Sequence, residues 1–292
     1  MTQNQATLIG LSAILLWSSV VGLIRAVSEY FGALGGAALM YSVATVFLCL
    51  SMGRPRIAPL PRAYLYWGSA LFVSYELCLS LSIGFAANAR QAIEVGMVNY
   101  LWPSFTLLAT VVFNRRPARW GLLLPGFVLS VFGIAWVLGG EQGLDGAVMW
   151  ANIRSNPLSY GLAFAGALIW AAYCVLTARL AQGQNAITLF FLLVALVLWI
   201  KYWAFGSGVM HWHGTSVLYL LLAAAAMGFG YAAWNVGILH GRVTLLAGAS
   251  YFIPVLSALL SALVLSTALP WAFWQGALTV CAGSLLCWFA TR

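Results

Sequence analysis

The sequence predicts an all-α membrane protein in which ten transmembrane helices form two inverted five-helix repeats. Three observations lead to this fold class: the composition, a regular series of apolar segments, and a motif that occurs once in each half of the chain. Of the 292 residues, 63% are hydrophobic and only 6% are charged, whereas soluble domains contain about 25% charged residues. A soluble core could not cover so much apolar surface, so we expect most of the chain to face lipid.

Ten apolar segments follow one another along the chain, each close to the roughly 20 residues that a helix needs to cross a bilayer. They span residues 7–27, 33–52, 63–86, 91–113, 119–139, 158–181, 186–205, 215–239, 243–266 and 271–290. The first follows MTQNQAT, which has no basic residue, so we interpret it as a retained helix and not as a cleaved signal peptide. The longest connection divides the chain into a first repeat (1–140), an inter-repeat loop (141–157) and a second, inverted repeat (158–292).

The distribution of charges predicts the orientation of these helices. With a cytoplasmic N-terminus, the cytoplasmic loops and the C-terminus contain arginines and no acidic residue, whereas basic and acidic residues balance on the other side. These arginines are Arg54, Arg56, Arg62, Arg115, Arg116, Arg119, Arg179, Arg242 and Arg292. Because the cytoplasmic loops of membrane proteins carry the excess of Lys and Arg, we expect both termini in the cytoplasm. The positive net charge then reflects topology and does not indicate a nucleic-acid partner.

A proline and a line of polar residues recur at the same helical spacing in segments 91–113 and 243–266. The recurring positions are Asn99, Pro103, Thr106 and Thr110 in the first segment and Ser250, Pro254, Ser257 and Ser261 in the second. A proline inside a helix leaves the carbonyl four residues earlier without its usual donor, and such a carbonyl must face protein or water. We therefore predict that Pro103 and Pro254 are hinges in two helices that line a central cavity. The alternative is a pair of ordinary packed kinks.

Other residues match between the halves at a similar offset of about 150 positions. The pairs are Trp17 with Trp170, Gly84 with Gly237, Gly126 with Gly276 and Gly133 with Gly283. Because five is an odd number, the second half must start on the other side of the membrane, so such a repeat is inverted. Repeats of this kind are typical of secondary transporters, which bind their substrates between the halves.

Glu76 is the ionisable residue that lies well inside an expected helix. Burying it without a partner costs about 2.5–3.5 kcal/mol on insertion scales, so we expect it to face a wet cavity or a hydrogen-bond donor. It could hold a substrate ammonium or carry a coupling proton. The alternative is a structural hydrogen bond to another helix.

Aromatic side chains are frequent in the segments expected around the cavity. Together with Glu76, the predicted substrate-binding residues are Trp17, Tyr75, Asn99, Tyr100, Trp102, Trp170, Tyr173, Tyr231, Trp234, Asn235 and Tyr251. Aromatic rings can stack on a flat apolar ligand, while a few polar groups orient it. For each ring, packing against other helices or against lipid is the alternative interpretation.

Several motifs of other protein classes are absent. The sequence has no GxxxxGK[ST] phosphate loop, no HExxH and no GxSxG, and its five cysteines form no CxxC pair. We therefore expect no ATP-driven step in this chain, no metal, no cofactor and no enzymatic activity. The expected partners are a small-molecule substrate and membrane lipid.

The strings MVNYLWPSFT (97–106), YAAWNVGILHG (231–241) and SYFIPVLSAL (250–259) resemble the drug/metabolite transporter superfamily, and within it the aromatic amino acid exporter branch. The resemblance covers essentially the whole chain. It implies export of phenylalanine, tyrosine and tryptophan, and of related amphipathic metabolites, by alternating access. It also implies that helices 1, 3, 4, 6, 8 and 9 line the central cavity.

Two other functions are compatible with the residues. Glu76 and the rings would also suit efflux of hydrophobic cations through cation–π contacts or of other small metabolites. A membrane-embedded enzyme acting on lipid would need a nucleophile or a His/Asp pair at the membrane face, and the sequence has no convincing one.

Overall fold

The computed structural model describes residues 1–114, 117–206 and 208–291, and all regular structure in these ranges is helical. In chain order the elements are α1 (Gln3–Phe31), α2 (Ala33–Met52), the π-helical turn η1 (Tyr64–Gly68), α3 (Ser69–Gly84), α4 (Ala89–Asn99), α5 (Trp102–Asn114), α6 (Trp120–Leu138), α7 (Gly146–Ser155), α8 (Pro157–Leu180), α9 (Ile187–Phe205), α10 (Gly214–His240), α11 (Val243–Ser250), α12 (Ile253–Val264) and α13 (Trp271–Ala290). Arg115, Arg116 and Arg292, which contribute to the predicted orientation, lie outside the described residues.

Every expected segment coincides with a helix or with a consecutive pair of elements. With α4 and α5 taken together as one span (Ala89–Phe113), eight helices in the described ranges are long and apolar enough to cross a membrane, and there are nine if the bent pair α11–α12 is also one span. Segment 63–86 is not among them, because it is divided between η1 and a 16-residue α3. The structure thus supports an all-α membrane protein with eight or nine candidate spans.

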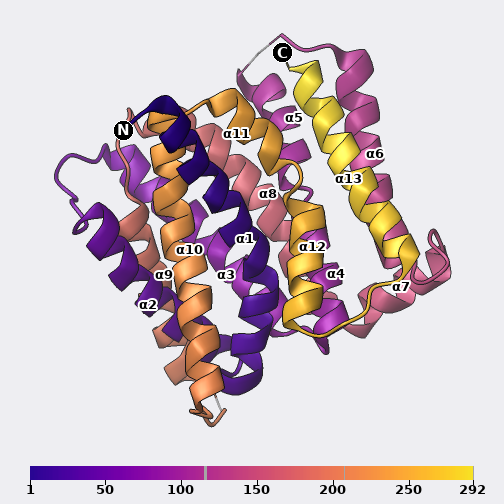
Figure 1. Cartoon of the computed structure of the whole chain (residues 1–292), viewed down its shortest axis with the longest axis horizontal. Helices are drawn as coiled ribbons and strands as arrows, with labels where there is room; N and C mark the ends of the chain where they lie inside the picture. Colours follow the sequence, from indigo (N-terminus) through magenta and orange to yellow (C-terminus); the bar gives the residue numbers. More distant parts are fainter. Residues whose placement is uncertain (115–116, 207, 292) are drawn as a thin grey trace.

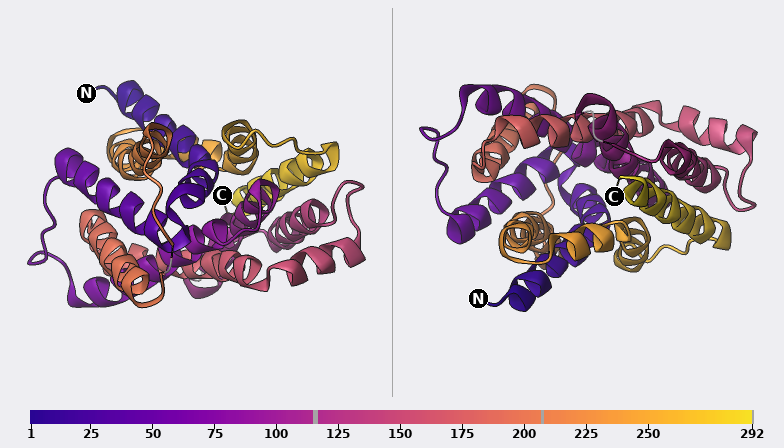
Figure 2. Two further views of the ribbon diagram at one scale, coloured as in Figure 1. Left: turned by 90° about the horizontal axis from the view of Figure 1, so that it is seen from below. Right: turned by 90° about the horizontal axis from the view of Figure 1, so that it is seen from above.

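Both chain ends lie at the same end of the bundle, whereas α7 and the α12–α13 connection lie at the other (Figure 1). We call these the terminal end and the distal end. The main antiparallel pairs are α1 with α10, α2 with α9, α3 with α8 and α6 with α13. The α2–α9 and α6–α13 pairs lie on opposite sides of the molecule, and the other long helices lie between them (Figures 1 and 2).

Local sequence signals explain where several helices begin. Thr2 and Gln5 form a capping box at α1, in which each side chain accepts a hydrogen bond from the backbone of the other. Asn88 caps α4 through the backbone N–H of Gln91, and Asn156 caps α8, which has Pro157 at its first position. These caps satisfy N–H groups that have no partner inside a helix.

The helix α7 was not expected in the inter-repeat loop. The carboxylate of Asp145 caps it by accepting hydrogen bonds from the backbone N–H groups of Ala147 (2.8 Å) and Val148 (3.1 Å). None of its ten residues is buried, so the apolar-segment criterion could not detect it. Its cap, however, is visible in the sequence.

The glycines of α6 and α13 that match between the halves pack against each other. A Cβ at Gly133 would lie 2.8 Å from the backbone oxygen of Gly276, and one at Gly126 would lie 2.8 Å from that of Gly283. Such distances exclude a side chain, so the glycines allow the two backbones to approach closely, as small residues do between membrane helices.

The two prolines predicted as hinges do not lie inside continuous helices. Residues 100–101 separate α4 from α5, and residues 251–252 separate α11 from α12. Pro103 and Pro254 each occupy the second position of the helix that follows. A proline fits there because the first N–H groups of a helix have no intrahelical partner. The expectation of a kinked helix is corrected to a broken one for Pro254, because α11 and α12 meet at 55°, whereas α4 and α5 together form one candidate span, Ala89–Phe113, that contains Pro103.

Candidate functional site

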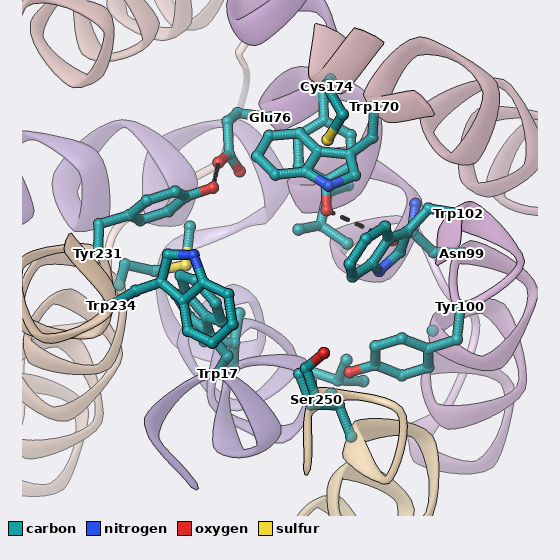
Figure 3. A pocket seen from close by; sticks show the side chains of 17 residues that line it. Trp17, Glu76, Asn99, Tyr100, Trp102, Trp170, Cys174, Tyr231, Trp234 and Ser250 are labelled. Carbon is teal, nitrogen blue, oxygen red and sulfur yellow. Dashed lines mark hydrogen bonds between the residues drawn. The ribbon is translucent and has the colours of Figure 1, made fainter. Parts of the chain in front are cut away.

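A cavity of about 250 Å³ lies among α1, α3, α4, α5, α8, α10, α11 and α12. All the helices that the resemblance placed around a central cavity therefore contribute side chains to it. Most of the predicted substrate-binding residues line it (Figure 3). They are Trp17, Tyr75, Glu76, Asn99, Tyr100, Trp102, Trp170, Tyr231 and Trp234.

Rings from α1 and α10 form one side of the cavity, which we call the α1–α10 wall. The ring centroid of Trp17 lies 5.1 Å from that of Tyr231 and 5.3 Å from that of Trp234. Aromatic pairs are favourable at these distances. Gly230 leaves room for the indole, because a Cβ there would lie 2.8 Å from Nε1 of Trp17. The three rings thus support one another as a packed surface.

Rings from α3, α5 and α8 form the other side, which we call the α3–α8 wall. The centroid of Trp170 lies 4.3 Å from that of Tyr75 and 6.3 Å from that of Trp102. Figure 3 shows Trp17 and Trp234 on one side of the cavity and Trp102 and Trp170 on the other. The matched tryptophans of the two halves, Trp17 and Trp170, therefore belong to opposite walls.

The carboxylate of Glu76 lies between these walls and is fully buried. The hydroxyl of Tyr231 donates a hydrogen bond to Oε1 (3.0 Å), and that of Tyr41 donates one to Oε2 (2.6 Å). Among the described residues, no basic side chain lies within ion-pair distance of Glu76. Glu76 therefore forms hydrogen bonds to neighbouring helices, and it also lines the cavity.

Asn99 joins three helices at the cavity. Its Nδ2 donates a hydrogen bond to the backbone oxygen of Ala163 in α8 (3.2 Å), and its Oδ1 accepts a long one from the hydroxyl of Tyr75 in α3 (3.5 Å). Its counterpart in the second half, Ser250, also lines the cavity but donates only to the backbone of its own helix, at Ala247 (2.8 Å). An asparagine amide has two N–H donors, and the bond to Ala163 uses one of those of Asn99.

Three predicted residues lie outside the cavity lining. Tyr173 stacks behind Trp170 with a centroid distance of 4.9 Å. Tyr251 is buried in the α11–α12 break, 6.0 Å from the ring of Trp288. Asn235 lines a separate hollow with residues such as Phe229, because consecutive helical residues point about 100° apart and Trp234 takes the position that faces the cavity.

Sequence reasoning missed several residues that line the cavity. They are Val20, Val21, Leu79, Gly96, Cys174, Met227, Ser250 and Ile253. Helical spacing could have indicated some of them, since Cys174 follows Trp170 by four residues and Met227 precedes Tyr231 by four. Ser250 was already matched to Asn99 by the repeat. In the ranges that the structure describes, no group of three His, Cys, Asp or Glu side chains could hold a metal ion.

The two ends of the cavity are closed to different degrees. At the distal end, every residue of α4 from Gln91 to Asn99 is buried. Glu94 accepts hydrogen bonds there from Tyr160 (3.0 Å) and Arg90 (3.2 Å). At the terminal end, Leu246 is the buried residue of α11. More residues are thus buried along α4 at the distal end than along α11 at the terminal end, and a separate hollow of about 550 Å³ lies beside Gln91 and Glu94 at the distal end.

Comparison with known proteins identifies close relatives of this chain, although no protein-family model matches it. The chain is 55% identical over 292 residues to the aromatic amino acid exporter YddG of Escherichia coli strain K12, with 100% of this chain and 99% of the relative covered. It is 54% identical over the same length to YddG of Salmonella typhimurium strain 14028s.

A solved crystal structure shares the fold. Its TM-score to this structure is 0.69 at 25% sequence identity, and the superposition covers 98% of this chain and 99% of that one. The chain therefore belongs to the family of the aromatic amino acid exporter YddG, within the drug/metabolite transporters.

Proposed function

We propose that this chain is a secondary transporter that exports phenylalanine, tyrosine, tryptophan and related amphipathic metabolites across a bacterial inner membrane. The observation that carries the proposal is the cavity of two aromatic walls with Glu76 between them, in a chain 55% identical to a curated aromatic amino acid exporter. At about 250 Å³ the cavity lies just below the range of about 300–1,000 Å³ that is typical of small-molecule sites. It therefore suits a ligand with a single ring system.

The proposed substrate is oriented by three contacts. Its ring lies between the α1–α10 and α3–α8 walls, where Trp17 and Trp170 stack on it from opposite sides. Its ammonium binds the carboxylate of Glu76, which lacks a basic partner in the described part of the chain. Its carboxylate accepts a hydrogen bond from the second N–H of Asn99. This assignment gives each end of a zwitterion a partner of complementary character.

The proposed topology has ten crossings in two inverted repeats, 1–140 and 158–292, joined by the loop at 141–157. Helix packing supports it. In this repeat, α1 is equivalent to α8, α3 to α10, and α4–α5 to α11–α12. The contact between α1 and α10 then has an equivalent between α8 and α3, and the contact between α1 and α12 has one between α8 and α5. The pairs α2–α9 and α6–α13 map onto themselves. The arginine-rich loops favour cytoplasmic termini.

The proposed transport cycle uses the two broken helices as hinges. Each break, at residues 100–101 and 251–252, is followed at once by a helix with proline in its first turn. The breaks allow α4 and α11 to move independently of α5 and α12. Movement of α4 would open the distal end, whereas movement of α11 would open the terminal end.

Exchange of labelled phenylalanine into proteoliposomes tests this function. Liposomes that contain the purified chain and unlabelled phenylalanine should accumulate the label faster than empty liposomes. Replacing Trp17 or Trp170 with alanine should lower exchange while the yield of folded protein is maintained. Uptake by the wild type no faster than by empty liposomes would refute the proposal.

Efflux of hydrophobic cations is a second candidate, and the acidic group in an aromatic cavity without a basic partner favours it. The two functions differ in competition assays. If amino acids are the substrates, excess tryptophan blocks labelled phenylalanine exchange and tetraphenylphosphonium does not. If hydrophobic cations are the substrates, the chain transports labelled tetraphenylphosphonium, and this flux is blocked by excess unlabelled cation and not by tryptophan.

A further inference from the structure

Tyr41 lies behind the cavity, on a helix that contributes no residue to the lining. It belongs to α2, is fully buried, and packs on the ring of Phe191 in α9 at a centroid distance of 5.4 Å. Its hydroxyl donates a hydrogen bond of 2.6 Å to Oε2 of Glu76. A buried ring with a short hydrogen bond to a carboxylate has little freedom to move.

The two hydroxyl groups that bind Glu76 have different positions relative to a ligand. Tyr231 lines the cavity, so a substrate can contact it and compete for Oε1. Tyr41 approaches the carboxylate from outside the lining, where a substrate has no access. The bond to Oε2 can therefore persist while Oε1 exchanges its donor for a ligand.

We propose that Tyr41 is a positioning residue that holds the Glu76 carboxylate toward the cavity and thereby selects ligands that carry an ammonium group. This inference rests on the proposed function, because it assigns Glu76 to the substrate ammonium. Without the Tyr41 hydroxyl, Oε2 loses its donor and the flexible glutamate side chain is no longer held in one orientation. Affinity for the ammonium then falls, while contacts of the ring with the aromatic walls remain.

The test compares two ligands that differ in the ammonium group. We measure inhibition of labelled phenylalanine exchange in proteoliposomes with the full-length chain. The measured value is the concentration of L-phenylalanine, or of 3-phenylpropionate, that lowers this exchange by half. For Tyr41→Phe, we expect the L-phenylalanine value to rise about tenfold, as for loss of one hydrogen bond to a charged group. The value for 3-phenylpropionate, which lacks the ammonium, should not change. An equal rise for both ligands would overturn the inference.

Tyr160→Phe is the matched control. It removes a hydrogen bond of the same kind, from a tyrosine hydroxyl to Oε2 of Glu94 (3.0 Å), at the distal end and away from the cavity. We expect the ratio of the two inhibitory concentrations to remain that of the wild type. If the ratio changes as much in Tyr160→Phe as in Tyr41→Phe, the effect is due to general destabilisation and the inference is overturned.

A double-mutant cycle tests whether Tyr41 acts through Glu76. In the Glu76→Gln background, adding Tyr41→Phe should not weaken L-phenylalanine inhibition further, whereas an additional tenfold loss would overturn the inference. The comparison of Glu76→Gln with the double variant still applies if Tyr41→Phe alone does not fold, because the neutral glutamine leaves no buried charge without a hydrogen-bond donor. Failure of the proposed function is seen separately, as wild-type protein that does not exchange phenylalanine.

Discussion

The half-helices α4 and α11 hold matching places in the two halves of the chain, yet they are packed very differently. Each precedes a break and a proline-initiated helix. All residues of α4 from Gln91 to Asn99 are buried, whereas α11 buries Leu246 alone. In the proposed inverted repeat, the element of the first half is thus more enclosed than that of the second half. Alternating access requires such an asymmetry, and exchange of the two settings would move the opening from one end to the other.

The contacts at the start of each half-helix show the same relationship. At the offset that relates Pro103 to Pro254, Gln91 corresponds to Arg242. Gln91 donates a hydrogen bond to Ser155 near the start of α8 (3.1 Å), and Arg242 donates one to Asn4 near the start of α1 (3.1 Å). The bond at the distal end is partly buried and the one at the terminal end is exposed. The two ends therefore have contacts of equal length and unequal burial.

The largest expected difference concerns the glycines of the two half-helices. A Cβ at Gly96 would lie 2.9 Å from Cγ1 of Val21, whereas one at Gly248 would have 3.5 Å to the ring of Trp288. Gly96→Val should therefore lower the free energy of unfolding by about 3 kcal/mol, the upper range for overpacking, and Gly248→Val by less than about 0.5 kcal/mol. Thermal unfolding in detergent measures both. Equal destabilisation would show that the half-helices are equally enclosed.

The cavity-lining polar counterparts should differ by a smaller amount. Asn99→Ala removes the side-chain bonds that join α4 to α3 and α8, so we expect a loss of about 2 kcal/mol of stability. Ser250→Ala removes a bond within one helix and should cost less than about 0.5 kcal/mol. Thermal unfolding without denaturant and phenylalanine exchange should both be impaired more by Asn99→Ala than by Ser250→Ala. The opposite order would contradict this comparison.

The smallest difference is expected for the contacts that close each end. At the offset that relates Trp17 to Trp170, Tyr160 corresponds to Thr7. Tyr160→Phe removes a buried bond to Glu94 and should cost about 1 kcal/mol. Thr7→Val removes a partly buried bond from the backbone N–H of Arg242 and should cost about 0.5 kcal/mol. Hydrogen exchange of backbone amides checks these values: it should become faster in α4 for Tyr160→Phe and in α11 for Thr7→Val. If Tyr160→Phe makes exchange faster in α11 and not in α4, the assignment is contradicted.

Much of the fold could be predicted because a bilayer imposes a length on every crossing helix. The apolar segments therefore coincide with helices, and the matched glycines of α6 and α13 meet. Features that depend on less apolar residues were missed or misjudged. Helix α7 buries none of its residues, and Pro254 starts a new helix at a 55° bend where a kink was expected, since a break and a kink have the same local sequence.

The candidate site was predictable where one helix face determines the outcome. Glu76 and most of the aromatic residues line the cavity, as expected for polar and aromatic groups deep in a membrane protein. Asn235 was misplaced because the helix face of α10 was not separated from that of its neighbour Trp234. Tyr41 could not be found at all, because its contact with Glu76 joins two helices whose relative placement no local pattern specifies.

Cysteine reactivity at corresponding positions tests the difference in burial between α4 and α11 most directly. Ala92 in α4 and Val243 in α11 correspond in the proposed repeat, and their exposed fractions are 0% and 51%. In a background without native cysteines, Ala92→Cys and Val243→Cys are reacted with a water-soluble maleimide in nanodiscs, where both membrane faces are accessible. Modification of Cys at position 243 should be at least about tenfold faster, as expected for an exposed site compared with one that must open locally. Equal rates, or faster modification at position 92, would contradict a form closed at the distal end.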